Sequence, residues 1–208
     1  MTRPEQVSNS SMSDPGPAAL IVLGFMLALI GIGFVFDPKA VVAADYAILI
    51  AGAAELLAGV LSFIKGLHYS GYAMTIFGLL LLGLFFLLTG GPVNAHMTHR
   101  LFDGHTVGWY VALMAVPLWF LVIPAALVRE YLAVVALLVL SGQVLTLGLA
   151  ELTGPPVLLK VSGWLALTGA ALIWFGAVRD MLTNLAAAHA AAQPHASVPD
   201  YADQIARR

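Results

Sequence analysis

The sequence contains no cysteine and few charged residues, and these two absences already restrict what the protein can be. Without cysteine it can form neither disulfides nor thiolate metal sites, and thiol catalysis is excluded. Only 10% of its 208 residues are charged, whereas a soluble domain has about one quarter. The formal net charge of −2 gives no reason to expect a nucleic-acid partner.

Apolar residues are what the sequence has in abundance, at 61% of the chain with a mean hydropathy of +0.94. A helix needs about 20 apolar residues to cross a bilayer. We expect spans at residues 17–36, 43–64, 70–89, 107–127, 130–150 and 157–178. Only helices satisfy their own backbone in lipid, and no alternating pattern indicates a barrel. The sequence therefore predicts an all-α integral membrane protein in which six transmembrane helices form one bundle.

Polar segments at the two ends complete the predicted organisation: a tail over 1–13, the six-helix membrane domain over 14–180, and a cytoplasmic tail over 181–208. The first segment lacks the layout of a cleaved signal peptide, so the first apolar run is expected to be a permanent span. Six spans place both termini on one side. The basic residues near the spans favour cytoplasmic termini, with Arg3, Lys65, Arg129 and Arg179 on that side against Lys39, Arg100 and Lys160 on the other. We expect a multi-pass protein of the plasma (inner) membrane.

Glu55, near the middle of the second span, is the polar residue that most needs an explanation. A charged side chain at the bilayer centre costs about 2.5–3.5 kcal/mol on insertion scales, so Glu55 is expected to face protein or water. Gly52, Glu55, Gly59 and Ser62 share one helix face, which suits close packing or the lining of a pore. Two roles stay open: a protonatable group beside a permeation path, or a hydrogen-bonded group that joins helices.

Small and polar residues in other spans favour helix packing more than chemistry. Gln143 in the fifth span is a candidate partner for Glu55. Pro117 and Pro124 are expected to kink the fourth span and free backbone carbonyls there. Glycines seven residues apart suit close helix contacts in three spans: Gly24 and Gly31, Gly71 and Gly78, Gly169 and Gly176.

The loop between the third and fourth spans carries His96, His99 and His105. Histidines at this spacing can sense pH or bind a metal, but no third ligand of defined geometry is present, and a solvated loop is the alternative. No metal or cofactor is assigned. The sequence also has no phosphate-binding loop, zinc-protease motif, nucleophile elbow or dinucleotide fingerprint, so an enzyme is not expected.

The first helix is preceded by the stretch DPGPAAL. We expect Asp14 to cap this helix and Pro15 to occupy its first position. Pro17 still falls within the first turn, where a missing N–H costs nothing. The helix is therefore expected to start at a defined point.

This stretch also resembles the NPAPLGL motif of the acetate uptake transporter family, the acetate and succinate permeases of bacteria and fungi. The stretch AGAAELLAGVLSFIKGLHYSGYAMTIFG is similar to that family's GGxxQxxAGxxExxxGNTFGxTAFxSYG. The stretches VGWYVALMAVPLWFLV and VSGWLALTGAALIWFG are similar to its fourth and sixth helices. The resemblance runs collinearly over residues 14–184.

The resemblance implies a six-helix protomer, in a hexameric ring, with a pore through each protomer. It implies passage of acetate and similar small monocarboxylates, either coupled to protons or channel-like. The family's apolar constriction comes from helices one, three and five. It falls here on Leu23 or Phe25, on Phe77, and near Leu138.

Several positions depart from the family pattern: its Asn is Asp14, its helix-two Gln is Glu55, and its helix-three Tyr is Phe77. The family's GNTFG is also replaced here, by Gly66-Leu67-His68-Tyr69-Ser70. A hydroxyl that binds a carboxylate discriminates strongly between substrates, so its loss puts acetate itself in question. The alternative is a urea or short-amide channel of the acid-gated type, because VFDPKAVVAADY is similar to the first loop of those six-helix proteins. An accessory membrane protein with no open passage is a third hypothesis.

Overall fold

The computed structural model describes residues 14–89 and 104–192, and within them it confirms the predicted all-helical bundle. No strand occurs in these two ranges. Every helix is long and apolar enough to cross a membrane. The helices are α1 (Gly16–Val35), α2 (Ala40–Ile64), α3 (His68–Thr89), α5 (Gly104–Leu127), α6 (Tyr131–Thr153) and α7 (Pro156–Ala192).

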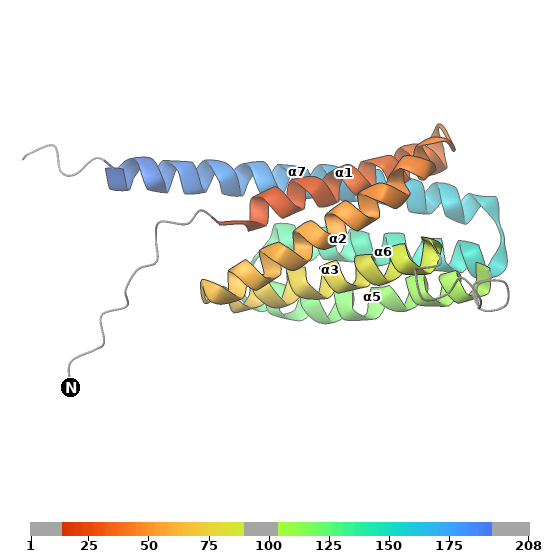
Figure 1. Cartoon of the computed structure of the whole chain (residues 1–208), viewed down its shortest axis with the longest axis horizontal. Coiled ribbons are helices and arrows are strands. Elements are labelled where there is room, and N and C mark those ends of the chain that lie inside the picture. Colours follow the sequence, from red (N-terminus) through yellow and green to blue (C-terminus); the bar gives the residue numbers. More distant parts are fainter. Residues whose placement is uncertain (1–13, 90–103, 193–208) are drawn as a thin grey trace, which may run out of the picture.

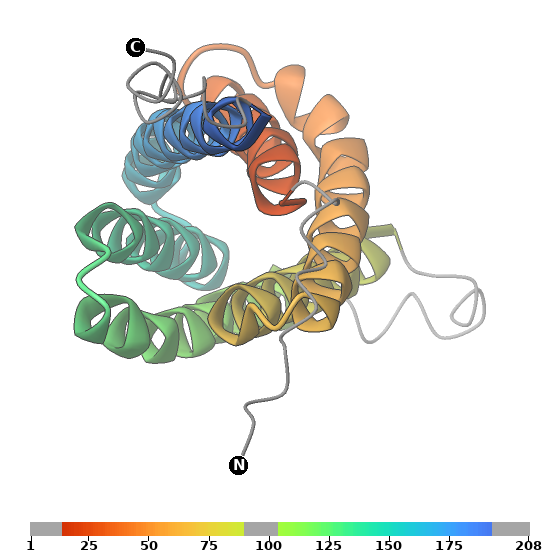
Figure 2. The ribbon, with the colours of Figure 1, turned by 90° about the vertical axis from the view of Figure 1, so that its left-hand side faces the viewer.

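The helices form a closed ring (Figures 1 and 2). Each helix packs against the next along the chain, and α7 returns to pack against α1. The first helix begins and the last one ends at the same end of the bundle, on the left in Figure 1. We call this the termini end and the other the far end. A ring of this kind encloses an axis along which side chains from all six helices can meet.

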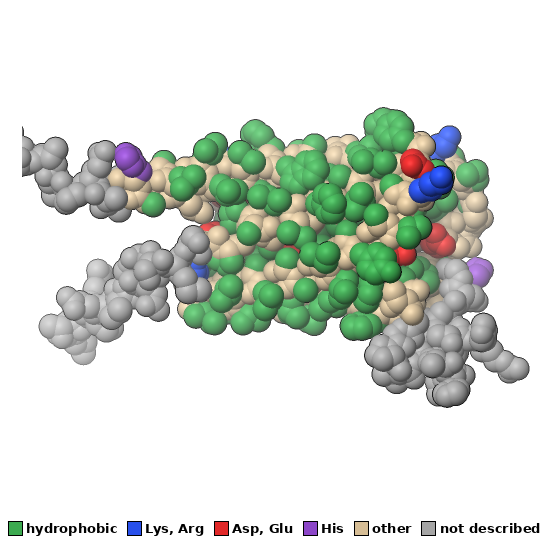
Figure 3. All heavy atoms as spheres, turned by 45° about the horizontal axis from the view of Figure 1, so that its top comes forward, with side chains coloured by type: hydrophobic (Ala, Val, Ile, Leu, Met, Phe, Trp, Pro, Cys, Tyr) green, Lys and Arg blue, Asp and Glu red, His purple; other side chains and the backbone are tan. Residues whose placement is uncertain are grey.

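The outer surface of the ring is apolar. Figure 3 shows hydrophobic side chains over the length of the bundle, with charged side chains mostly near its two ends. Exposed large side chains include Phe25, Phe120 and Phe175. Helices that are apolar on all sides belong in a lipid environment, because water would oppose such a surface. The chain is therefore a multi-pass membrane protein.

Glycines bring neighbouring helix backbones into direct contact. A Cβ atom on Gly78 of α3 would lie 2.5 Å from the Leu56 nitrogen and 2.8 Å from the Gly52 oxygen of α2. On the other side of the ring, a Cβ on Gly31 of α1 would lie 2.8 Å from the Gly163 oxygen of α7. These approaches leave no room for any side chain, which is the packing role expected from the glycine spacing.

Two tyrosines join α3 to α5, the neighbours that pack least extensively. The Tyr69 hydroxyl of α3 donates to the Leu121 carbonyl of α5 at 3.1 Å. The Tyr110 hydroxyl of α5 donates back to the Leu80 carbonyl of α3 at 2.9 Å. Gly83 leaves the space that the Tyr110 hydroxyl occupies. Within the described residues, these two hydrogen bonds and direct packing join α3 to α5.

Tight turns at the termini end are built in the same way after α2 and α5. Gly66 follows α2 with a φ of 77°, and the amide of Leu67 donates to the Ser62 carbonyl at 2.9 Å. Arg129 follows α5 with a φ of 63°, and the amide of Glu130 donates to the Ala125 carbonyl at 3.0 Å. Both are left-handed helix ends in which a backbone bond satisfies an otherwise unpaired carbonyl.

Both ends of the chain differ in detail from the sequence expectation. The last helix continues to Ala192, so residues 181–192, expected as part of a tail, are helical. Alanine and leucine dominate this stretch and no proline or glycine interrupts it, so the helix has no reason to stop at 178. At the other end, Pro15 occupies the capping position, and α1 begins at Gly16. The Asp14 carboxylate still accepts a hydrogen bond from the Gly16 amide at 2.9 Å, the bond that a capping aspartate makes.

Candidate functional site

Two cavities follow one another along the axis of the ring. The larger, about 190 Å³, lies towards the termini end between α1, α2, α3, α6 and α7, and we call it the Glu55 cavity. The smaller, about 40 Å³, lies towards the far end between α1, α2, α3, α5 and α6, and we call it the Gln143 cavity. Each cavity carries few polar side chains on otherwise apolar walls.

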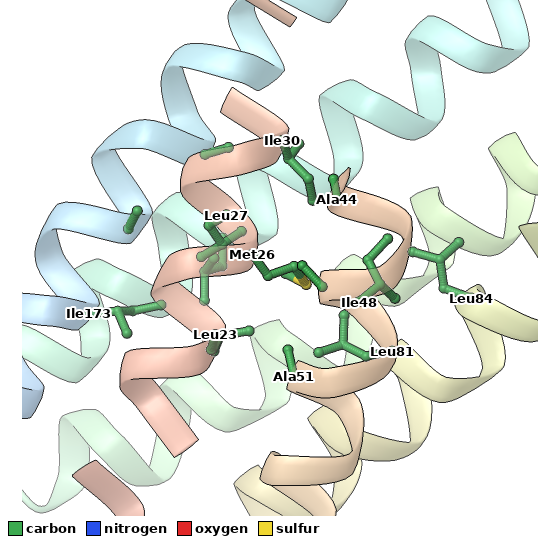
Figure 4. Close-up of a cluster of buried hydrophobic side chains, with 14 of the residues drawn as sticks. Leu23, Met26, Leu27, Ile30, Ala44, Ile48, Ala51, Leu81, Leu84 and Ile173 are labelled. Atoms are coloured by element: carbon green, nitrogen blue, oxygen red, sulfur yellow. The ribbon is translucent and has the colours of Figure 1, made fainter. Parts of the chain in front are cut away.

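Three apolar side chains line both cavities and therefore lie between them: Leu23, Phe77 and Leu140. They come from α1, α3 and α6, which are the first, third and fifth of the described helices. Leu23 and Leu140 are only 3% and 4% exposed. Beyond them, Met26 of α1, Ile48 of α2 and Leu81 of α3 gather in the space between their helices (Figure 4). The axis is thus closed at its centre by hydrocarbon.

Glu55 lies in the middle of α2 and is 1% exposed. Its helix face carries Gly52 and Gly59, which let α3 approach so closely that the carboxyl group is shielded from lipid. The Oε1 atom is buried and has no hydrogen-bond partner among the described residues. Glu55 therefore faces the protein interior and a cavity, as a carboxyl group at this depth must.

The other polar side chains of the Glu55 cavity are already engaged within the protein. The Tyr69 hydroxyl donates to the Leu121 carbonyl. The Ser70 hydroxyl donates to the Met74 sulfur at 3.6 Å. Both residues line the cavity. Among the side chains that line this cavity, Glu55 carries the buried oxygen that has no hydrogen-bond partner in the described structure.

Gln143 lies in the other cavity and is paired with α7. Its Nε2 donates to the Ser162 hydroxyl at 3.4 Å, and that hydroxyl donates to the backbone carbonyl of Gln143 at 3.1 Å. The sequence-based suggestion that Gln143 partners Glu55 is therefore wrong, because the two side chains line different cavities. Sequence reasoning missed Ser162, which is fully buried in the structure. A serine in a membrane helix is too common to have drawn attention.

Phe25 and Leu138 point away from the axis. They are 55% and 50% exposed and line neither cavity. Each stands two residues from an inward-facing leucine, Leu23 and Leu140, and two residues turn an α-helix by about 200°. Of the constriction candidates, the structure thus brings together Leu23 and Phe77, and it adds Leu140 in the place expected near Leu138.

The start of α1 lies beside the Glu55 cavity. A Cβ on Gly16 would lie 3.0 Å from the Met74 side chain, which lines that cavity. Pro17 is buried in the first turn, and the Asp14 carboxylate is held by the Gly16 amide. The motif around Asp14, Pro15 and Pro17 therefore fixes how α1 enters the bundle next to the cavity.

The predicted histidine cluster falls mostly outside the described residues. His96 and His99 lie there. His105 is exposed at the start of α5. Among the residues that the structure describes, no group of three His, Asp or Glu side chains could hold a metal ion.

Comparison with known proteins identifies the family. The sequence profile of the GPR1/FUN34/yaaH family matches residues 2–195, nearly the whole chain. The chain belongs to this family. The match confirms the resemblance seen in the helix-one and helix-two motifs. None of the curated proteins compared with the chain matches it.

A solved structure shares the fold of this GPR1/FUN34/yaaH protein. It is described as the structure of the bacterial acetate channel SatP. The two superpose with a TM-score of 0.71 at 20% sequence identity, over 84% of this chain and 95% of the other. At this identity the likeness establishes the six-helix fold, and the substrate has to be argued from the site.

Proposed function

We propose that this GPR1/FUN34/yaaH protein is a transporter or channel that carries small monocarboxylates, acetate among them, along the axis of its helix ring. The observation that carries the proposal is the pair of cavities in line, separated by Leu23, Phe77 and Leu140. A route for a small solute needs space on both sides of a narrow barrier, and apolar side chains form a barrier that dewets and excludes ions. The shared fold with a protein described as an acetate channel supports the substrate class.

In this proposal Leu23, Phe77 and Leu140 form the constriction, and the solute passes when these side chains move apart. Glu55 stands on one side of the barrier and Gln143 on the other. Glu55 is the proton-linked group of the pathway, since it is the carboxyl group buried along it. With cytoplasmic termini, as the basic residues favour, the Glu55 cavity lies on the cytoplasmic side.

The outer surface also suits assembly with further copies, and a homo-oligomer in the plasma membrane is part of the proposal, with the hexamer implied by the family resemblance. The pathway does not depend on it, because both cavities lie within one protomer.

The decisive measurement is uptake of labelled acetate into proteoliposomes at acidic and at neutral pH. We expect uptake above that of empty vesicles, and faster at acidic pH. Uptake equal to that of empty vesicles would refute a monocarboxylate transporter. Urea, the alternative substrate, is tested on the same vesicles by stopped-flow permeability, where a rate above that of protein-free vesicles would favour the amide-channel hypothesis.

A further inference from the structure

One side chain of the Glu55 cavity offers a ligand a buried polar atom that is not already hydrogen-bonded within the described structure. Tyr69 and Ser70 spend their hydroxyl hydrogens on the Leu121 carbonyl and the Met74 sulfur. Glu55 alone presents a buried polar atom, Oε1, with no partner among the described residues. A buried polar atom left unpaired is destabilising, so a ligand that donates a hydrogen bond to it is favoured at this position.

The rest of the cavity is apolar and larger than acetate requires. Leu20, Leu137 and Ile173 line the same cavity as Glu55. The volume is about 190 Å³, and an apolar cavity of about 150 Å³ is known to accept benzene, with six heavy atoms. Acetic acid has four heavy atoms, whereas butyric acid has six and valeric acid seven. The space beside Glu55 therefore matches a carboxyl group that carries a chain of three or four further carbons.

The protonation states of the acid and of Glu55 determine whether such an acid can bind. Two ionised carboxyl groups at one apolar site repel each other, and each also loses its hydration. A single proton between them replaces this repulsion by a short, charge-assisted O–H···O⁻ hydrogen bond. Tyr69 of α3 is the other titratable side chain that lines the cavity, and α1, α6 and α7 contribute none to its lining. On α2 itself, Asp45 lies almost three helical turns away.

We propose that the Glu55 cavity is a binding site for monocarboxylic acids of four to five carbons, whose carboxyl group shares one proton with Glu55 while the chain lies against Leu137 and Ile173. The inference rests on the proposed transport function and narrows its substrate class. In this arrangement the acid and one proton bind together, because the two carboxyl groups form a stable pair only when they share that proton.

The predicted preference for chain length is tested by isothermal titration calorimetry on the purified full-length protein, with acetate, propionate, butyrate and valerate as ligands. Each methylene buried in an apolar cavity is expected to tighten binding about fourfold, so butyrate should bind about 15-fold more tightly than acetate. Ala136→Leu fills part of the cavity that Ala136 lines. It should weaken butyrate and valerate binding about tenfold or more while sparing acetate. Ala171→Leu makes the same change on the exposed face of α7 and should change nothing.

The shared proton is tested by the pH dependence of butyrate binding from about pH 5 to about pH 9. Affinity should fall with rising pH, approaching about tenfold per pH unit once free Glu55 and free butyrate are both ionised. Glu55→Gln keeps the size of the side chain and supplies an amide N–H that donates to the butyrate anion without a proton being taken up, so it should still bind butyrate but lose this alkaline decline. A decline that persists in Glu55→Gln would overturn the shared proton.

The experiments distinguish a failure of this binding site from a failure of the proposed transport function. If acetate crosses proteoliposomes but affinity does not rise with chain length, or Ala136→Leu weakens all four acids equally, the site assignment is wrong and the transport function stands. If the acids bind with the expected chain-length order but none is taken up, the binding site stands and the transport function is wrong.

Discussion

Replacing Gly78 by alanine should disturb both the stability and the barrier of this protein. Gly78 lies where α3 crosses α2, and an added Cβ would meet the Leu56 nitrogen at 2.5 Å and the Gly52 oxygen at 2.8 Å. Both are backbone atoms of a long helix and cannot turn aside. Carbon contacts are comfortable at roughly 3.5 Å, so α3 must move outward by roughly 1 Å. Overpacking of this kind costs about 1–3 kcal/mol.

Gly142→Ala is the matched control. Gly142 is also inside a helix, α6, but its Cβ would meet nothing closer than the Leu165 side chain at 3.5 Å, an ordinary contact. Both variants gain about 1 kcal/mol of helix propensity. The difference between them therefore isolates the cost of the crossing, and Gly142→Ala should be neutral or stabilising.

Thermal unfolding in detergent, followed by the fluorescence of the four tryptophans, measures the stability difference. Labelled-acetate flux measures the second consequence: Phe77 is the neighbour of Gly78, so moving α3 outward draws Phe77 away from Leu23. We expect Gly78→Ala to unfold at a lower temperature than Gly142→Ala and to leak more acetate. Equal unfolding temperatures for the two variants would refute the close crossing on which this reasoning depends.

Two further substitutions have expected outcomes that follow from single side chains. Arg129→Gly should stabilise the protein by about 0.5–1 kcal/mol in the same unfolding assay. The left-handed backbone costs a non-glycine residue about 1–2 kcal/mol, and the greater conformational freedom of glycine in the unfolded chain cancels part of the gain from removing that cost. A lower unfolding temperature would contradict this prediction. Leu140→Val removes one methylene from the barrier and should raise initial acetate uptake by up to about tenfold. Leu138→Val, on the exposed face of the same helix, should leave uptake unchanged. Equal effects from both variants would count against the constriction.

The bundle itself was within reach of sequence reasoning. Six apolar runs of sufficient length admit one fold class in a membrane, because a backbone in lipid has to satisfy its hydrogen bonds internally. The unusual length of α7 was also encoded, by a run of helix-forming residues between Gly176 and Pro194 that contains no breaker. The predicted span ended at 178 because it was bounded by apolar length, whereas helix propensity continues through the alanine-rich segment that follows.

The candidate site was only partly within reach. Glu55 stood out from the sequence, because a carboxyl group in an apolar span is costly unless the protein surrounds it. The partner suggested for it did not hold, since Gln143 pairs with Ser162 in the neighbouring cavity. A choice between Leu138 and Leu140 was equally out of reach, because two apolar residues on opposite faces of an apolar helix carry no sequence signal.

The sequence by itself therefore determined the membrane environment, the six helices, the close-packing glycine faces of α1 and α3, and one acidic group in the middle of α2. These features depend on local hydrophobicity and spacing, which a chain carries before it folds. The paired glycines Gly169 and Gly176 of α7 make only side-chain contacts. Only the tertiary structure decided which side chains meet on the axis: Leu23, Phe77 and Leu140 between two cavities, with Glu55 on one side of them. The physical reason is that every helix here is apolar all round, so the rotation of each about its own axis is set by contacts with its two neighbours in the ring.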